Sequence, residues 1–371
     1  MRKIEHSEIL SLVSEGFSAT PEIYSTERKA KILDDLASLN VKNLTFSKET
    51  KLLINLMEKW CPVVSSAALQ KLFKCEIISI PAPIFNAFSK VTEGRPSIVI
   101  FDGLLDAALA HICVSSINTC LPKSLEKMFP REKLPSTSAG SLARSILLLL
   151  INRFIYHGEP LPDFDLLSSE MKIDTDADNL FMGTLWWVLL HELGHIELGH
   201  TKYSTNNSRH SICHELIVAE KISKFQSQEF EADKYVYDSL NELGKKDCFY
   251  AWTHIALTAS LMLEVRMANK KGTHPLAINR LRYAHDISTS SNVEASNEDT
   301  LERLTKHASA HVKMLSGISE NKRKGLMEFD DLSRDDLFLL LSGLKDAFFE
   351  TGINIERFIN STGSSWRTRF E

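Results

Sequence analysis

Ten residues of the chain, HELGHIELGH (191–200), place three histidines and two glutamates directly after an apolar run, LWWVLL. Because residues four apart lie on one face of an α-helix, His191 and His195 can present two imidazoles to one metal ion. In zinc hydrolases with this HExxH pattern the glutamate, here Glu192, takes a proton from the attacking water and returns it to the leaving amine. The competing interpretation is a solvated His/Glu cluster on a helix, which would lack a third ligand.

Two nearby candidates for the third ligand fit poorly. His200 would complete an HExxHxxGxxH pattern, which needs a glycine seven and a histidine ten positions after the first histidine. Here Gly199 is eight and His200 nine positions after His191, so the register is off by one. His214 and Glu215 open a second HE pair, HELIV, which lacks the other histidine and is typical of a surface pair at a helix start.

Glu229 is the strongest candidate for the third ligand. It lies in QEFEAD (228–233), where Glu229 and Asp233 are four apart on an expected helix and therefore share a face. Glu229 can then reach the metal while Asp233 accepts the free N–H of a ligating imidazole and fixes its tautomer. The same spacing would also suit an acidic, solvated helix face. Two imidazoles and one carboxylate favour zinc over other divalent ions.

A further histidine, His274 in THPLAINRLRYA (273–284), is followed by Pro275 and, six positions after the histidine, by Arg280. By itself a His-Pro pair marks the start of a helix, on which Arg280 would be an exposed cation. In a metal hydrolase, His274 can instead donate a hydrogen bond to the oxyanion of the tetrahedral intermediate. The residues alone leave both interpretations open.

Three motifs in this order, HExxH, ExxxD and HPxxxxR, resemble those of the HtpX and CAAX prenyl protease group of gluzincin metallopeptidases. The resemblance covers roughly residues 97–284 and implies a zincin-like core. It implies zinc ligands His191, His195 and Glu229, a general base Glu192, Asp233 and Arg280 behind the ligands, and a substrate-contacting His274. Those enzymes are built on membrane-spanning helices, whereas this chain has no apolar stretch of about 20 residues. HELGH, a second GH and an EAD element also resemble the phage-exclusion Lit peptidases, cytoplasmic bacterial proteases that cut a host translation factor.

Composition limits the possible partners. The chain has 43 basic and 48 acidic residues, so no overall field favours nucleic acid or an anionic membrane. Its first residues, MRKIEHSEILSL, carry charges where a secretory signal needs an apolar core. Six cysteines without a CxxC pair are typical of free thiols in a reducing compartment. The apolar windows 145–151 and 185–190 are too short to span a membrane and are expected to be buried core helices. We therefore expect a cytoplasmic protein.

Apolar periodicity predicts an α+β, mainly helical fold: a zincin-like metallopeptidase core with a small sheet and flanking helical regions. The expected parts are a helical N-terminal region (1–95), a catalytic domain (96–285), and a linker with a helical C-terminal region (286–371). A β-branched run predicts a strand at residues 97–101. At a sheet edge beside the metal, this strand would hold an extended substrate by strand addition.

The leading functional hypothesis is a zinc-dependent endopeptidase that acts on a protein or peptide substrate in the cytoplasm, with zinc and His274 stabilising the oxyanion. One alternative is a regulatory or partner-sensing protein on the same fold, with a structural or absent metal. The intact Glu192 argues against it, because a structural site needs ligands but no base. A third hypothesis is a protease that the terminal helical regions hold in check until an activating partner triggers it.

Overall fold

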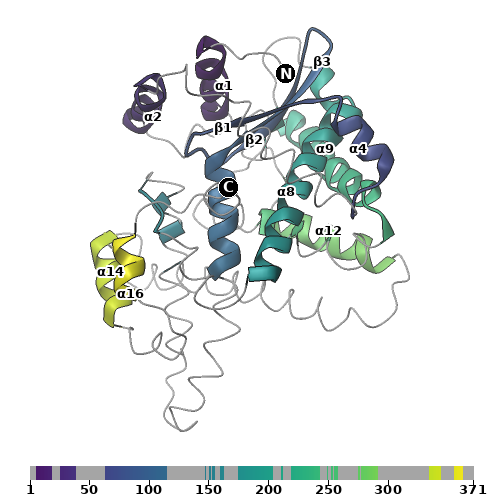
Figure 1. Cartoon of the computed structure of the whole chain (residues 1–371). Helices are drawn as coiled ribbons and strands as arrows, with labels where there is room; N and C mark the ends of the chain where they lie inside the picture. Colours follow the sequence, from purple (N-terminus) through teal and green to yellow (C-terminus); the bar gives the residue numbers. More distant parts are fainter. Residues whose placement is uncertain are drawn as a thin grey trace. The chain divides into compact units, whose positions relative to one another are not determined.

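A computed structural model gives the structure of the chain (Figure 1). The described residues are 6–18, 26–38, 63–114, 147–162 in part, 174–203, 210–211, 219–242, 249–257 in part, 275–290 except 276, 334–343 and 355–361. The chain divides into two compact units, each assembled from two separate stretches: 1–105 with 182–309, and 106–181 with 310–371. The division into three consecutive regions, with boundaries near 95 and 285, stays a prediction.

The first unit holds a small mixed sheet. Over the described residues its order is β1-β3-β2-β4, with β1 at Glu76–Ile80, β2 at Ala87–Thr92, β3 at Arg95–Phe101 and β4 at His210–Ser211. β1 runs parallel to β3, whereas β2 is antiparallel to both β3 and β4. Together with the helices, this sheet confirms the predicted α+β, mainly helical class.

The strand predicted at residues 97–101 is confirmed as part of β3, but its expected place at a sheet edge is wrong. β3 lies between β1 and β2, and Ile98 is paired with Ile77 on one side and Ser89 on the other. Two neighbours therefore use its backbone groups, so β3 cannot take up a substrate by strand addition. The physical reason is that its run from Ile98 to Phe101 is fully buried, as suits a strand in a sheet interior.

The first unit also contains most of the described helices. They are α1 (His6–Ser18), α2 (Thr26–Ser38), α4 (Ser66–Leu72), the greater part of α8 (Asp174–Glu197), the short 3₁₀ helix η3 (His200–Tyr203), α9 (Ala219–Ser239) and α12 (Ala277–Ser290). α9 and α12 lie side by side (Figure 1). α1, α2 and α4 lie within residues 1–95, where a helical N-terminal region was expected.

α8 is a core helix rather than an amphipathic one. Its middle, Leu185 to Leu190, is buried on every side, which confirms that this apolar window is a buried helix. α8 ends just before Gly199, whose φ of +77° is a left-handed conformation that glycine adopts at low cost. The amide of Gly199 donates to the carbonyl of Ile196 (3.1 Å), closing the last turn. The chain can therefore turn sharply into η3.

The regular secondary structure described in the second unit is helical. α14 (Arg334–Gly343) and α16 (Ile355–Asn360) contact each other, and Leu147, Leu150 and Ile151 are helical and buried, as predicted for the window 145–151. In the first unit, α12 continues to Ser290, which is five residues into the linker expected from residue 286. Among the described residues, none of the helices has the length and apolar content that a membrane crossing requires.

Candidate metal centre

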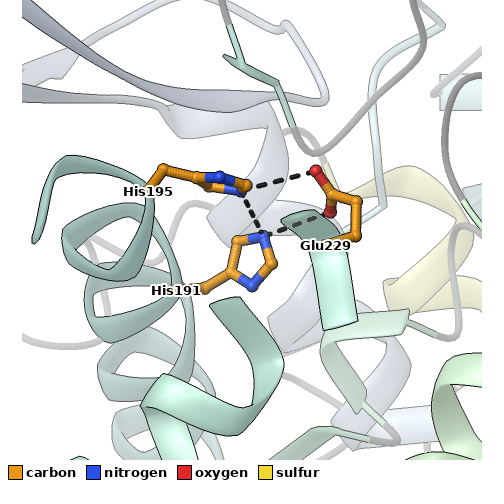
Figure 2. A group of neighbouring side chains, drawn as sticks. All are labelled: His191, His195 and Glu229. Atoms are coloured by element: carbon orange, nitrogen blue, oxygen red, sulfur yellow. Dashed lines mark hydrogen bonds and ion pairs between the residues drawn. The ribbon is translucent and has the colours of Figure 1, made fainter. Parts of the chain in front are cut away.

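One helix supplies both histidines of the predicted metal pair. His191 and His195 lie one turn apart on α8, and both side chains are buried. Their Nε2 atoms are 3.2 Å apart, and the rings meet at 84° with centroids separated by 4.8 Å. Figure 2 shows the two imidazole nitrogens pointing toward a common position. The i, i+4 spacing therefore places two potential ligand atoms together.

α9 brings a carboxylate to the same position. Oε2 of Glu229 is 3.3 Å from Nε2 of His191, and Oε1 is 3.4 Å from Nε2 of His195 (Figure 2). The three side chains form a buried group whose ligand atoms can hold a metal ion. The sequence alone left an acidic, solvated face as an alternative for Glu229, but its side chain is only 3% exposed.

Gly194, in the middle of HELGH, allows this approach of the two helices. A Cβ atom at Gly194 would lie 3.1 Å from Cβ of Tyr235 and 3.3 Å from Cα of Ala232, both on α9. Such separations are tighter than ordinary van der Waals contact, so a side chain at this position would push α9 outward. The glycine therefore contributes to the reach of Glu229 toward the two histidines.

A buried ion pair lies behind His191. Nε and Nη2 of Arg280 on α12 donate to Oδ2 (2.8 Å) and Oδ1 (2.6 Å) of Asp233 on α9. Nδ1 of His191 is 3.1 Å from Oδ1 of Asp233, which identifies Nδ1 as the protonated nitrogen and leaves Nε2 free for a metal. Burial would raise the pKa of Asp233, but the charge and hydrogen bonds of Arg280 hold that pKa below its ordinary value. Asp233 is therefore an anion.

Trp187 fixes the plane of the His191 ring. Its indole is stacked on the imidazole, with centroids 5.0 Å apart and planes 12° from parallel. The guanidinium carbon of Arg280 lies 5.5 Å from the centre of the same indole, within the range of a cation–π contact. The ring of His191 is therefore restrained through its hydrogen bond to Asp233 and through its stacking contact.

Glu192 lies completely buried beside the three potential ligands. Burial raises its pKa to about 7, and the charge of His191 and a contact with the Ser89 hydroxyl on β2 oppose that rise. Neither carboxylate oxygen has a partner within strict hydrogen-bond geometry among the described residues, so the Ser89 hydroxyl is a close neighbour rather than a formed bond. A carboxyl group with this pKa can exchange a proton near neutral pH.

The electrostatic field at the centre favours a cation. Burial would lower the pKa of His191, but its hydrogen bonds to Asp233 and Glu229 outweigh burial and raise that pKa to about 9. The positive charge of Arg280, whose Nη1 is 3.2 Å from Oε2 of Glu229, opposes this rise without cancelling it. Positive charge at Nε2 of His191 is thus stabilised, and a metal ion held between this nitrogen and Glu229 would meet the same field.

The sequence of this region resembles a known peptidase family. Residues 155–299 match the Peptidase U49 model. This family is a Lit-like peptidase family, so the match supports a peptidase. The matched segment spans under half of the chain but includes all the potential ligands and the residues behind them. No curated protein and no solved structure matches the chain. The resemblance to the HtpX and CAAX prenyl protease group stays a prediction.

Within the Peptidase U49 segment, the structure brings together most of the residues that the sequence singled out. His191, His195 and Glu229 converge, with Glu192 beside them; Asp233 and Arg280 pair behind them. Arg280, which the sequence allowed to be an exposed helical cation, is only 2% exposed. His274 lies outside the described residues, as do His214 and Glu215.

The sequence did not reveal two contacts within the same segment. His200 lies beside the three potential ligands rather than among them: its Nδ1 is 2.9 Å from Nδ1 of His195, and its Nε2 is 3.1 Å from Oε2 of Glu231. The second contact is the stacking of Trp187 on His191, because the sequence indicated only that Trp187 belongs to an apolar run. The available signal for His200 was the Gly-His pair, because a glycine often ends a helix and lets the next residue turn back.

Proposed function

We propose that the chain is a zinc-dependent endopeptidase. The observation that carries this proposal is the convergence of two imidazole nitrogens and one carboxylate, from two helices, beside a buried glutamate with a pKa near neutrality. The match of residues 155–299 to a peptidase family supports the hydrolysis of peptide bonds. Together they favour a catalytic centre over a structural metal site, which would need ligands but no base.

The spacing of the ligand atoms suits zinc. Ligands at 2.0–2.1 Å from a tetrahedral zinc ion lie about 3.3 Å apart. The distances among Nε2 of His191, Nε2 of His195 and the Glu229 oxygens are 3.2, 3.3 and 3.4 Å. When bound, zinc would polarise the scissile carbonyl and make a water molecule acidic. His191, His195 and Glu229 would hold the ion.

Glu192 is the proposed general acid and base. Its carboxylate would accept a proton from the attacking water and deliver it to the leaving amine, which requires a pKa near the working pH. Its environment supplies that pKa, because the carboxyl group is buried and receives only a loose contact from the Ser89 hydroxyl. Asp233 and Arg280 would keep His191 in the tautomer with a free Nε2. His274 is the proposed donor to the substrate oxyanion.

The sharpest test replaces Glu192 with glutamine, which keeps the shape of the side chain but cannot carry the proton. Glu192→Gln should retain about one zinc per chain by metal analysis while proteolysis falls by roughly 10²- to 10⁴-fold. A matched control on the same helix is Glu197→Gln, because Glu197 pairs with Lys71 at the surface and should leave activity unchanged. Unchanged proteolysis in zinc-loaded Glu192→Gln would refute the role of Glu192.

The Lit-like family of the matched model supports a more specific form of the proposal, a protease of the phage-exclusion type that stays inactive until triggered. Its test compares new protein termini in bacterial cells expressing the wild-type chain and the Glu192→Gln variant, with and without phage infection. Termini that depend on both Glu192 and infection are expected. If the new termini appear equally in uninfected cells, the proposed trigger is refuted but the proposed peptidase activity is not.

A further inference from the structure

His200 is the first residue after the glycine that ends α8, and its ring is packed against the metal centre. The side chain is only 5% exposed. Its ring centroid is 5.1 Å from that of His195 at an angle of 63°, and the two Nδ1 atoms are 2.9 Å apart. On its far side, Nε2 of His200 is 3.1 Å from Oε2 of Glu231, whose other carboxylate oxygen accepts from Ser227 (3.0 Å).

These contacts are compatible with one arrangement of protons. Nε2 of His195 must be unprotonated if it is to bind the proposed metal ion together with Glu229, so the proton of His195 lies on Nδ1. Nδ1–H of His195 then donates to Nδ1 of His200, and the proton of His200 is on Nε2, where it donates to the carboxylate of Glu231. Each donor has an acceptor, and no other pair of neutral tautomers satisfies both contacts and leaves Nε2 of His195 free.

The turn at Gly199 is what allows His200 to reach His195. On a continuous helix, a residue five positions after another points about 140° away from it. The left-handed conformation of Gly199, with φ of +77°, ends α8 after Glu197, and the chain returns with His200 against the ligand. The second Gly-His pair in HELGHIELGH is therefore explained by contact with the first.

We propose that His200 is a positioning residue that fixes the tautomer and ring plane of His195, with Glu231 orienting His200 in turn. This inference rests on the proposed zinc site. The two ligand imidazoles would then be held by different means. His191 is held by the buried Asp233–Arg280 pair, whereas His195 is held by a neutral imidazole linked to a carboxylate whose side chain is 53% exposed. Loss of such an outer contact typically weakens metal binding 10- to 100-fold.

The test compares two replacements of His200 that differ in one hydrogen-bond acceptor. His200→Phe keeps a ring of similar size but has no acceptor, so the dissociation constant for zinc should rise about 10- to 100-fold. His200→Asn places an amide oxygen near the former Nδ1 and should recover much of that affinity. Glu231→Gln should have a smaller effect, and Asp238→Asn, an exposed acid on the same helix, should have none. Affinities are measured by competition with a chromophoric chelator.

The outcomes separate the positioning role from the zinc site itself. If the wild-type chain binds no zinc, the proposed function fails and this inference fails with it. If the wild-type chain binds zinc but the folded His200→Phe variant binds it with equal affinity, the positioning role alone is refuted. Should that variant not fold, long-range ¹⁵N–¹H correlations of the zinc-loaded wild type decide the matter. They are expected to show His200 protonated at Nε2, and protonation at Nδ1 would overturn the inference.

Discussion

At the scale of residues, the candidate metal centre contains more buried carboxyl groups than buried guanidinium groups to pair with them. Glu192, Glu229 and Asp233 are all buried, and Arg280 is the buried guanidinium that pairs with two of them. Burying a carboxylate without a counter-charge costs several kcal/mol, so such groups bind protons or metal ions instead. The raised pKa values of Glu192 and His191 express this demand for positive charge. A divalent cation would meet it directly.

The first prediction concerns pH and the stability of the metal-free protein. Burial raises the pKa of Glu192 from 4.5 to about 7 in the folded chain, so the folded state binds a proton that the unfolded state releases between these values. Stability contributed by this group is therefore present below pH 4.5 and is lost as pH rises to 7. Replacing it with glutamine removes that loss.

The free energy of unfolding of Glu192→Gln should consequently exceed that of the wild type above pH 7 by of the order of 3 kcal/mol. The difference should vanish near pH 4.5. Both proteins are measured after chelation, by urea titration at several pH values. A difference that is the same at pH 4.5 and pH 8 would show that Glu192 keeps its ordinary pKa in the fold.

A second prediction concerns the Asp233–Arg280 pair. Arg280→Met leaves Asp233 buried without its two guanidinium bonds, and breaking one side of a buried pair costs about 3–5 kcal/mol. The double variant Asp233→Asn with Arg280→Met should be less destabilised than the sum of the single variants, because it leaves no lone charge. Lys234→Gln is the surface control, since its pair with Asp238 is about half exposed and worth at most about 1 kcal/mol. Strictly additive urea-unfolding free energies would contradict the coupling.

The residues that sequence could predict are those related by helical spacing. His191 with His195, and Glu229 with Asp233, are each four apart, so the helix period alone places each pair on one face. The contact between His195 and His200 is different in kind. It requires the helix to stop, and where α8 stops depends on Gly199 and its surroundings rather than on any repeat of ligand-type residues.

At the scale of elements, the centre depends on how closely α8 and α9 pack. Gly194 lies where a Cβ atom would press on Tyr235 and Ala232 of α9. Gly194→Ala should therefore move α9 outward by a few tenths of an ångström, which separates Glu229 from the two histidines. Because alanine is the better helix former by about 1 kcal/mol, the metal-free stability should change little.

The third prediction follows from these opposing effects. Gly194→Ala should weaken zinc binding several-fold while shifting the metal-free unfolding midpoint only slightly, as measured by chelator competition and by urea titration of the same preparations. A variant that loses stability and keeps its zinc affinity would mean that strain spreads into the core instead of moving Glu229. Equal zinc affinity and equal stability would mean that the helices tolerate the methyl group without separating.

The sheet shows why element order is harder to predict than element type. The run from Ile98 to Phe101 is continuous and β-branched, so its strand was found from the sequence alone. β1 and β2 were missed, because two prolines lie between them and β2 mixes buried with exposed residues over only six positions. The interior place of β3 arises from its pairing with both of these strands, which no local pattern of β3 encodes.

At the scale of the whole chain, each of the two compact units is made of two stretches that are separate in the sequence. The chain leaves the first unit near residue 105, returns near 182 and leaves again near 309. Every described residue of the candidate metal centre belongs to the first unit, whereas the match to the peptidase family, 155–299, includes residues of both. α8 has residues in both units, since its first turns precede residue 182 whereas His191 and His195 follow it.

The fourth prediction separates the units by their response to zinc. If zinc binds His191, His195 and Glu229 in the folded chain, as proposed, and not in the unfolded chain, it should stabilise the first unit by mass action. Amide hydrogen exchange with and without zinc should slow in α9, in α12 and in α8 from residue 182 onward. α14 and α16 of the second unit should be unaffected, and protection should fade toward the first turn of α8. Equal protection of α14 and α16 would instead mean that both units unfold together as one cooperative unit.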